Sequence, residues 1–155
     1  MSMKILDENL REKWKNYIWQ GAVAGLTVIA ITTVLADFLD LILIAAIGST
    51  AFVVFALPDT RTARARNVIG GHALCILAGI SCSFLGMPRL QGGLAVAFGF
   101  SLMVTTNTEH PPAAGTALAL AGSPSLKGAV FVLASAFIYS GLRKALFTKL
   151  KNLAK

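Results

Sequence analysis

The sequence predicts an all-α integral membrane protein: a small bundle of four long transmembrane helices and two short broken or half helices. Three observations support this fold class. Apolar residues make up 55% of the chain and charged residues only 14%, which is outside the usual range of soluble domains. Several uncharged stretches are long enough to cross a bilayer as helices. Proline, glycine and small polar residues interrupt two of these stretches.

The net charge of +7 is carried by loops and chain ends that flank the apolar stretches. A surface for nucleic acid would interleave the bases with stacking aromatic residues, so nucleic acid is not an expected partner. If all six elements cross the membrane, both termini and twelve of the 14 bases share one side, with only Arg89 and Lys127 opposite. The positive-inside rule makes that side cytoplasmic.

Residues 1–17 repeat apolar and charged positions at helical spacing. This pattern predicts a cytoplasmic amphipathic helix on the membrane surface, with a solvated tail as the alternative. Residues 18–36 are uncharged and long enough to span the membrane. Gly21 and Gly25 form a Gly-x-x-x-Gly pair within this span, which fits contact with another protein or packing inside the monomer.

The second stretch, residues 41–57, is short for a span, and Gly48, Ser49 and Thr50 interrupt its large aliphatic residues. We therefore expect a discontinuous helix there. Residues 67–87 form another long span. Asn67, near the start of this span, is either a helix cap or a solute contact. His72 either makes a structural hydrogen bond or has a functional role.

The second part of the chain contains a long span at 91–106, a half helix at 113–121, a last span at 126–142 and a basic cytoplasmic tail at 143–155. Residues 18–142 form a single transmembrane domain. Cys75 and Cys82 are roughly 10 Å apart along one helix, too far for a disulfide, and two thiols make no zinc signature. We expect no metal and no cofactor.

The stretch from Asn107 to Thr116 separates two apolar segments with an acid, an imidazole and two prolines. Pro111 and Pro112 keep the backbone extended, and such backbone at membrane depth lines a cavity or is buried by protein. The alternative is a polar loop at the membrane surface. The predicted solute site contains Gly48, Ser49, Thr50, Asn67, His72, Asn107, Glu109, His110, Pro111, Pro112, Gly115 and Thr116.

Two parts of the chain resemble one another. Gly48-Ser49-Thr50-Ala51 precedes Pro58 much as Gly115-Thr116-Ala117 precedes Pro124. We therefore predict two repeats, 18–87 and 91–142, each with a long helix, a short element and a long helix. Three crossings in each half would invert the halves and bring the short elements together near the midplane.

A half helix that begins inside the membrane points unpaired amide groups at the interior, which favours a small anion. Ser49, Thr50, Thr116 and His110 add donors, and few full charges lie nearby. A monovalent anion or a small neutral solute fits this site. Glu109 would repel an anion unless it is protonated or paired, and burial would favour its neutral form. Proton coupling through Glu109 or His110 is therefore a hypothesis.

Residues 107–114, Asn-Thr-Glu-His-Pro-Pro-Ala-Ala, resemble the signature of the HPP family of integral membrane proteins. Residues 66–72 are similar to that family's second recurring block, and residues 48–58 to its Gly-Ala-Ser/Thr segment. The resemblance implies a small transmembrane bundle. Because plant chloroplast and cyanobacterial members are associated with nitrite transport, it also implies transport of nitrite or a related anion. The missing transit sequence suggests a bacterial cytoplasmic membrane.

The leading hypothesis is a non-enzymatic transporter or channel for a small anion, with protons as a further partner and the lipid bilayer around it. The first alternative is a membrane metalloenzyme that uses His72, His110, Glu109 and Asp59. The second is a structural or sensory membrane protein. Glycine-rich surfaces and small size favour a homo-oligomer, either a dimer or a trimer.

Overall fold

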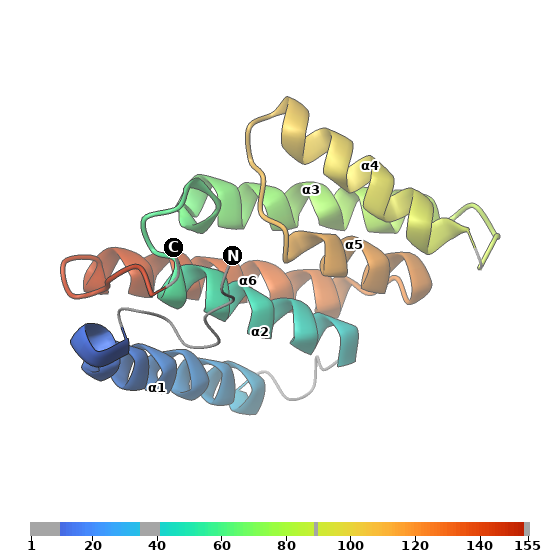
Figure 1. Cartoon of the computed structure of the whole chain (residues 1–155). Helices are drawn as coiled ribbons and strands as arrows, with labels where there is room; N and C mark the ends of the chain where they lie inside the picture. The colour runs from blue at the N-terminus through green and yellow to red at the C-terminus, as the bar shows by residue number, and fades with distance from the viewer. Residues whose placement is uncertain (1–9, 35–40, 89, 154–155) are drawn as a thin grey trace, which may run out of the picture.

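The computed structural model describes residues 10–34, 41–88 and 90–153 (Figure 1). Within these residues the fold is entirely helical, with six α-helices, one short 3-10 helix and no strand. The all-α prediction is confirmed. The helices are α1 (Leu10–Val34), α2 (Leu41–Ala56), the 3-10 helix η2 (Arg61–Ala63), α3 (Ala65–Ser83), α4 (Gln91–Thr105), α5 (Ala113–Gly122) and α6 (Leu126–Leu146).

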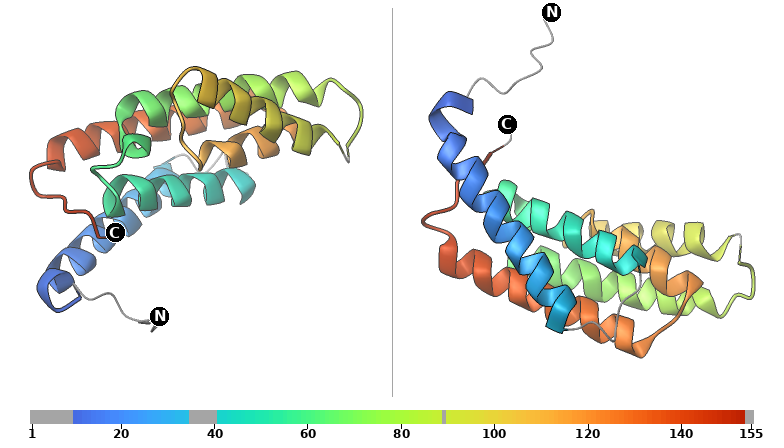
Figure 2. Two further views of the ribbon diagram at one scale, coloured as in Figure 1. Left: turned by 45° about the horizontal axis from the view of Figure 1, so that its top comes forward. Right: turned by 90° about the horizontal axis from the view of Figure 1, so that it is seen from below.

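The helices run up and down one bundle, with α3 between α4 and α5 on one side and α6 on another (Figures 1 and 2). The start of α1, the turn from α2 to α3 and the end of α6 lie at the same end of the bundle. Helix α5 is short and begins well inside this end, where the segment from α4 leads into it. Its first turn is therefore surrounded by the middle parts of other helices.

Within the described parts of the chain, three helices are long and apolar enough to cross a membrane: Glu12–Val34, Ala65–Ser83 and Leu126–Leu146. The prediction of four long helices is wrong for residues 91–106, because α4 has only 15 residues. At 1.5 Å per residue it is roughly 23 Å long, less than the roughly 30 Å hydrocarbon core. The helix stops because Asn107 adopts φ 55°, a left-handed conformation that a helix cannot continue.

Helix α2 is continuous from Leu41 to Ala56, so the predicted break at Gly48, Ser49 and Thr50 is wrong. The hydroxyl groups of Ser49 and Thr50 lie 3.0 and 2.9 Å from the carbonyl oxygen of Ala46, three and four residues back. Such bonds to the preceding turn allow small polar residues to remain inside an apolar helix.

Helix α1 is also continuous, and no boundary separates residues 10–17 from the span that follows. The remainder of the predicted amphipathic segment, residues 1–9, lies outside the described residues, as do 35 and 36. A Cβ atom placed on Gly21 or Gly25 would meet no atom within 4 Å. Packing of this glycine pair inside the monomer is therefore not observed, and contact with another protein stays a prediction.

The short helix expected at 113–121 is confirmed as α5, Ala113–Gly122. It packs closely against α3 because small residues face one another. A Cβ atom on Gly79 would lie 2.7 Å from the carbonyl oxygen of Ala117, so only glycine permits this separation of the two backbones. Alanine-rich α5 is thereby buried in the bundle, with Ala113, Ala117 and Leu120 fully inaccessible.

Residues 147–153 follow α6 and return to α1 and α2. The side-chain nitrogen of Gln20 donates to the carbonyl oxygens of Phe55 and Lys151, and its oxygen accepts from the Lys151 amide at 3.1 Å. The Leu153 amide donates to Ala56, and the Tyr17 hydroxyl donates to Leu153. One buried glutamine thus ties the C-terminal strap, residues 147–153, to two helices.

We expect Gln20→Leu to release this strap, because leucine cannot replace any of the three hydrogen bonds. Limited trypsin digestion should then cleave after Lys149 and Lys151 at least several times faster than in the wild type. Thr32→Val is the matched control, since the Thr32 hydroxyl bonds only to carbonyls of its own helix. Equal cleavage rates in Gln20→Leu and the wild type would contradict the assignment.

Candidate functional site

Four polar side chains from separate parts of the chain meet inside the bundle. Thr50 lies on α2, His72 on α3, His110 on the segment before α5, and Thr116 on the first turn of α5. Each has a relative exposure of 0%. Thr50 is six residues before the end of α2, which places this four-residue cluster roughly 9 Å inside that helix end.

The four side chains form a connected set of hydrogen bonds. Thr50 Oγ1 lies 3.0 Å from His72 Nε2 and 3.2 Å from His110 Nε2. His72 Nδ1 lies 2.9 Å from Thr116 Oγ1, and His110 Nδ1 lies 2.8 Å from the carbonyl oxygen of Thr62. The imidazole centroids are 5.1 Å apart. One hydroxyl therefore bridges two imidazoles.

The carbonyl oxygen of Thr62 determines where the protons lie, because it can only accept. His110 Nδ1 must donate to it, so the Nε2 atom of a neutral His110 accepts from the Thr50 hydroxyl. Thr50 Oγ1 can then accept from His72 Nε2, which leaves His72 Nδ1 to accept from Thr116. Every hydrogen bond in the neutral cluster then points from Thr116 toward Thr62.

The loop that carries His110 is held by α3. Asn67 donates through its side chain to the Glu109 carbonyl oxygen at 3.1 Å. A Cβ atom on Gly71 would lie 2.8 Å from His110 Cβ and 3.0 Å from the carbonyl oxygen of Thr108. Glycine is required at residue 71 because the loop backbone lies directly against the helix.

Glu109 does not enter the cluster. Its carboxylate pairs with Arg61 at the surface, where the two side chains are 33% and 51% exposed. A hydrogen bond from its own backbone amide, then the Arg61 guanidinium, and more weakly the charge of Arg66, hold the pKa of this carboxyl below its ordinary value. Our expectation that burial would favour a neutral Glu109 is therefore wrong, because the side chain is partly exposed and paired with Arg61.

Asn107 joins this outer layer, where its side-chain oxygen accepts from Arg61 at 3.2 Å. Arg66 donates to the Thr106 carbonyl oxygen at 2.9 Å. Two arginines that we interpreted as topology signals therefore also fix the segment before α5. Their binding partners are 40 or more residues away, so charge patterning alone gave no sign of the contacts.

The amide groups at the start of α5 are already used. Ala113, Ala114 and Gly115 donate to the carbonyl oxygens of His110, Pro111 and Pro112 at 2.9–3.1 Å. The proposed anion contact with unpaired half-helix amides is therefore absent from this conformation. The imidazole and hydroxyl donors of the cluster are paired with one another and with the Thr62 carbonyl oxygen, so an anion that binds there must replace one of these hydrogen bonds.

Of the remaining predicted residues, Pro112 is buried and immediately precedes α5, and Gly115 packs against Ala46 of α2. Both position the cluster without belonging to it. A Cβ atom on Gly48 would meet nothing within 4 Å, and Ser49 and Pro111 are both exposed. These three do not join the four residues.

Sequence reasoning missed Thr62 and Thr108. Thr62 acts through its main-chain carbonyl, which no side-chain pattern reveals. Thr108 is buried against Gly70, and its amide donates to the Met103 carbonyl oxygen at 2.9 Å. Its hydroxyl lies 2.8 Å from that of Thr106. The sequence did offer one signal for Thr108. Asn107 and Thr108 stand together shortly before the His-Pro-Pro run, and Asn and Thr are typical of tight turns.

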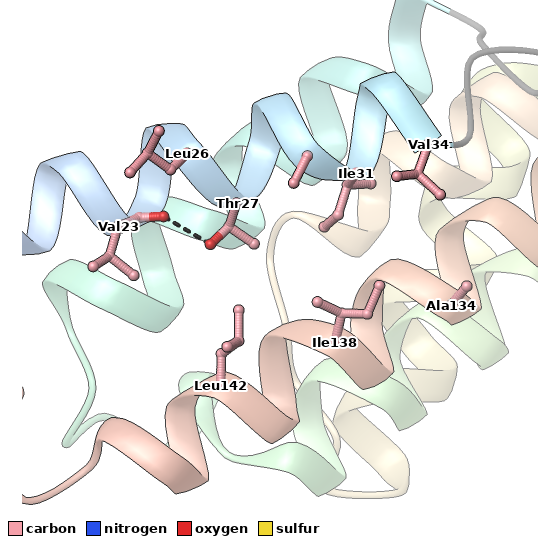
Figure 3. Close-up of a pocket in the computed structure, with 9 residues that line it drawn as sticks. Val23, Leu26, Thr27, Ile31, Val34, Ala134, Ile138 and Leu142 are labelled. Carbon is pink, nitrogen blue, oxygen red and sulfur yellow. Dashed lines mark hydrogen bonds between the residues drawn. The ribbon is translucent and has the colours of Figure 1, made fainter.

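A cavity of about 520 Å³ lies elsewhere, between α1 and α6 (Figure 3). Its only labelled polar residue, Thr27, donates its hydroxyl to the Val23 carbonyl oxygen at 2.7 Å. A charged solute would therefore find no free polar partner there. The residues that line it are Val23, Leu26, Thr27, Ala30, Ile31, Val34, Ala134, Ile138 and Leu142.

No group of three or more His, Cys, Asp or Glu side chains lies together in the described parts of the chain. Cys75 and Cys82 are buried free thiols, and Cys75 contacts the Met103 sulfur at 3.9 Å. A metal bound at the two imidazoles would need its remaining ligands from Thr50, Thr116, water or residues outside the described ranges.

Comparisons with known proteins identify the family of the chain and a distant relative. The model of the family described as HPP, transmembrane region, matches residues 9–150. A transmembrane protein of Dictyostelium discoideum is 29% identical over an alignment of 110 residues, and the match covers 66% of this chain and 38% of that protein. The chain thus spans well under half of that relative's length. No solved structure matches. With apolar helices and a family match over nearly its whole length, the chain belongs to the HPP transmembrane region family and is a multi-pass membrane protein.

Proposed function

We propose that this chain is a transporter or channel for a small monovalent anion, most simply nitrite, which binds at the four-residue cluster. The single observation that carries the proposal is the burial of two imidazoles and two hydroxyls between apolar helices. Polar and ionisable groups inside a membrane protein are costly, and they characteristically mark solute pathways.

The chemistry of the cluster favours a small anion. Imidazole and hydroxyl groups can donate hydrogen bonds, and Arg61 and Arg66 lie at the outer edge of the segment that carries His110. No arginine or lysine of the described chain reaches the cluster itself, so a multiply charged solute would lack counter-charges. The choice of nitrite rests on the resemblance to family members associated with that anion.

The cluster is closed in this structure, because all four side chains have zero exposure. Entry of a solute therefore requires movement of the segment before α5 or of α5 itself. The Arg61–Glu109 pair bridges this segment and the α2–α3 turn, so its opening is the natural first step. Ion pairs at an exposed edge contribute little stability, which permits such opening.

We also propose that the two halves, α1–α2–α3 and α4–α5–α6, are inverted repeats. Corresponding helices run in opposite directions, and α2 contacts α5 while α3 contacts α6 (Figure 1). In such a repeat the pair α1–α6 corresponds to the pair α4–α3. The match is incomplete, because α4 packs along α3 whereas the cavity in Figure 3 separates α1 from α6. The bases at the start of α1, after the end of α2 and at the end of α6 favour a cytoplasmic location for that end of the bundle.

We place the protein in a bacterial cytoplasmic membrane as a homo-oligomer, with the free glycine face of α1 as its contact surface. Glu109, one of the expected metal ligands, pairs with Arg61 at the surface and does not join the two imidazoles, which favours transport over a metalloenzyme. A structural or sensory role would explain the buried cluster only through its contribution to stability, whereas transport also explains its polar chemistry.

Flux measurements in liposomes test the proposal. Purified wild type should move nitrite, and nitrate, formate, chloride and urea as competitors should define the selectivity. His110→Ala and Thr116→Val should each reduce the nitrite rate at least tenfold, because each removes one end of the hydrogen-bond chain. Ser49→Ala is the matched control, since this hydroxyl is outside the cluster and bonds only to its own helix.

Loss of flux in both cluster variants, with Ser49→Ala retained, would support binding at the cluster. Absence of flux for every solute in folded wild-type protein would refute the transport proposal. Metal analysis of that same protein would then distinguish the enzyme from the structural or sensory alternative.

A further inference from the structure

The arrangement around Thr50 accommodates one additional proton without displacement of any heavy atom. Thr50 Oγ1 lies within hydrogen-bond distance of three partners: His72 Nε2, His110 Nε2 and the Ala46 carbonyl oxygen at 2.9 Å. A hydroxyl has one proton and two lone pairs. It can therefore donate to His110 in one state and to Ala46 in another.

In the first state His110 is neutral and the Thr50 hydroxyl donates to its Nε2 atom. In the second state Nε2 carries the extra proton and donates to Thr50 Oγ1, while the hydroxyl turns to the Ala46 carbonyl oxygen. His72 Nε2 donates to Thr50 in both states. All hydrogen bonds are satisfied before and after protonation, so rotation of a single hydroxyl is sufficient.

The extra charge has no protein counter-ion at the cluster. Helices α2, α4 and α5 contain no ionisable residue. From the other elements packed around it, α3 supplies the Cys75 thiol and Arg66, and α6 supplies the Tyr139 phenol. The 3-10 helix η2 supplies Arg61, and the segment before α5 supplies Glu109. The Glu109 carboxylate is held by Arg61 at the surface. Two imidazolium rings with centroids 5.1 Å apart would repel one another, so the cluster takes up only one additional proton.

We propose that His110 takes up one proton together with each transported anion, so that transport is an electrically neutral symport. The inference rests on the proposed function. The proton binds to the Nε2 lone pair from water on the loading side and returns to water with the anion on the other side. An imidazolium and a monovalent anion neutralise one another in the apolar interior, which makes their binding mutually dependent.

Two measurements on the full chain test this inference. In detergent at very low buffer strength, nitrite should cause the wild type to take up about one proton per bound anion. In liposomes without a pH gradient, a nitrite gradient should move protons in the same direction at a ratio near one, and clamped membrane potentials should not change the rate. Protein-free liposomes correct for diffusion of nitrous acid.

Two variants assign the proton. His110→Gln keeps a side chain capable of hydrogen bonding but cannot hold the proton, so nitrite-linked proton uptake should vanish. Glu109→Gln removes the carboxylate next to His110 in the chain, and the proton-to-anion ratio should remain near one. A ratio that falls to zero in Glu109→Gln and persists in His110→Gln would overturn the assignment to His110.

The outcomes for the wild type separate the two proposals. Nitrite flux that depends on the membrane potential and moves no protons would refute the symport while anion transport stands. Absence of flux for nitrite and every competitor would refute anion transport, and the symport with it.

Discussion

Thr50→Val is expected to abolish anion uptake and to reduce stability, because a single hydroxyl bridges both imidazoles. Valine matches threonine in shape but leaves His72 Nε2 and His110 Nε2 without a partner. Each buried polar atom left unsatisfied costs on the order of 1–3 kcal/mol. Uptake of nitrite into liposomes and thermal unfolding in detergent measure the two effects on the same preparation.

Thr50→Ser is the rescue variant, since it restores the hydroxyl and should recover most of the uptake. Thr27→Val is a second control, because Thr27 is also a buried threonine that bonds to a carbonyl four residues back. It should change uptake less than twofold. Full uptake by Thr50→Val, or equal losses in Thr50→Val and Thr27→Val, would contradict the role given to the bridging hydroxyl.

Gly71→Ala should displace the segment that carries His110. The added methyl carbon would lie 2.8 Å from His110 Cβ, 3.0 Å from the Thr108 carbonyl oxygen and 3.3 Å from the Met103 sulfur. Backbone must move to relieve these contacts, and overpacking of this kind costs about 1–3 kcal/mol. We expect a clearly lower unfolding temperature together with at least a tenfold loss of uptake.

Gly48→Ala provides the contrast. A Cβ atom at Gly48 meets nothing within 4 Å, and α2 is continuous there. Alanine favours a helix by about 1 kcal/mol over glycine, so this variant should unfold at the same or a higher temperature. Loss of stability in Gly48→Ala comparable to that in Gly71→Ala would show that the glycine contacts are misassigned.

Much of the cluster could be anticipated from the sequence. Histidines are rare in apolar segments, so His72 and His110 were conspicuous, and the resemblance between the two short elements brought Thr50 and Thr116 together. The expected break in α2 was wrong because the Ser49 hydroxyl bonds to the carbonyl oxygen of Ala46 and the Thr50 hydroxyl has partners on two buried imidazoles, so neither group interrupts the helix. These contacts depend on packing and are not visible in composition.

The long-range pairs that fix the segment before α5 and the C-terminal strap could not be predicted. The partners Arg61 and Glu109 are 48 residues apart, and Gln20 bonds to Lys151 across 131 residues. Periodicity describes one helix at a time and carries no information on such distant contacts. Glu109 was misplaced for the same reason: its position beside His110 suggested burial, whereas its side chain turns outward to an arginine of another loop.

The most direct test of the four-residue cluster as the anion site is ¹⁵N NMR of the imidazole nitrogens in tag-free protein, with and without nitrite. The chain contains 2 histidines, so His110→Gln assigns both signals. We expect His72 protonated at Nε2 and His110 at Nδ1 before nitrite is added, and a proton on His110 Nε2 once nitrite is bound. Saturating nitrite that is transported but leaves both rings unchanged would contradict this account.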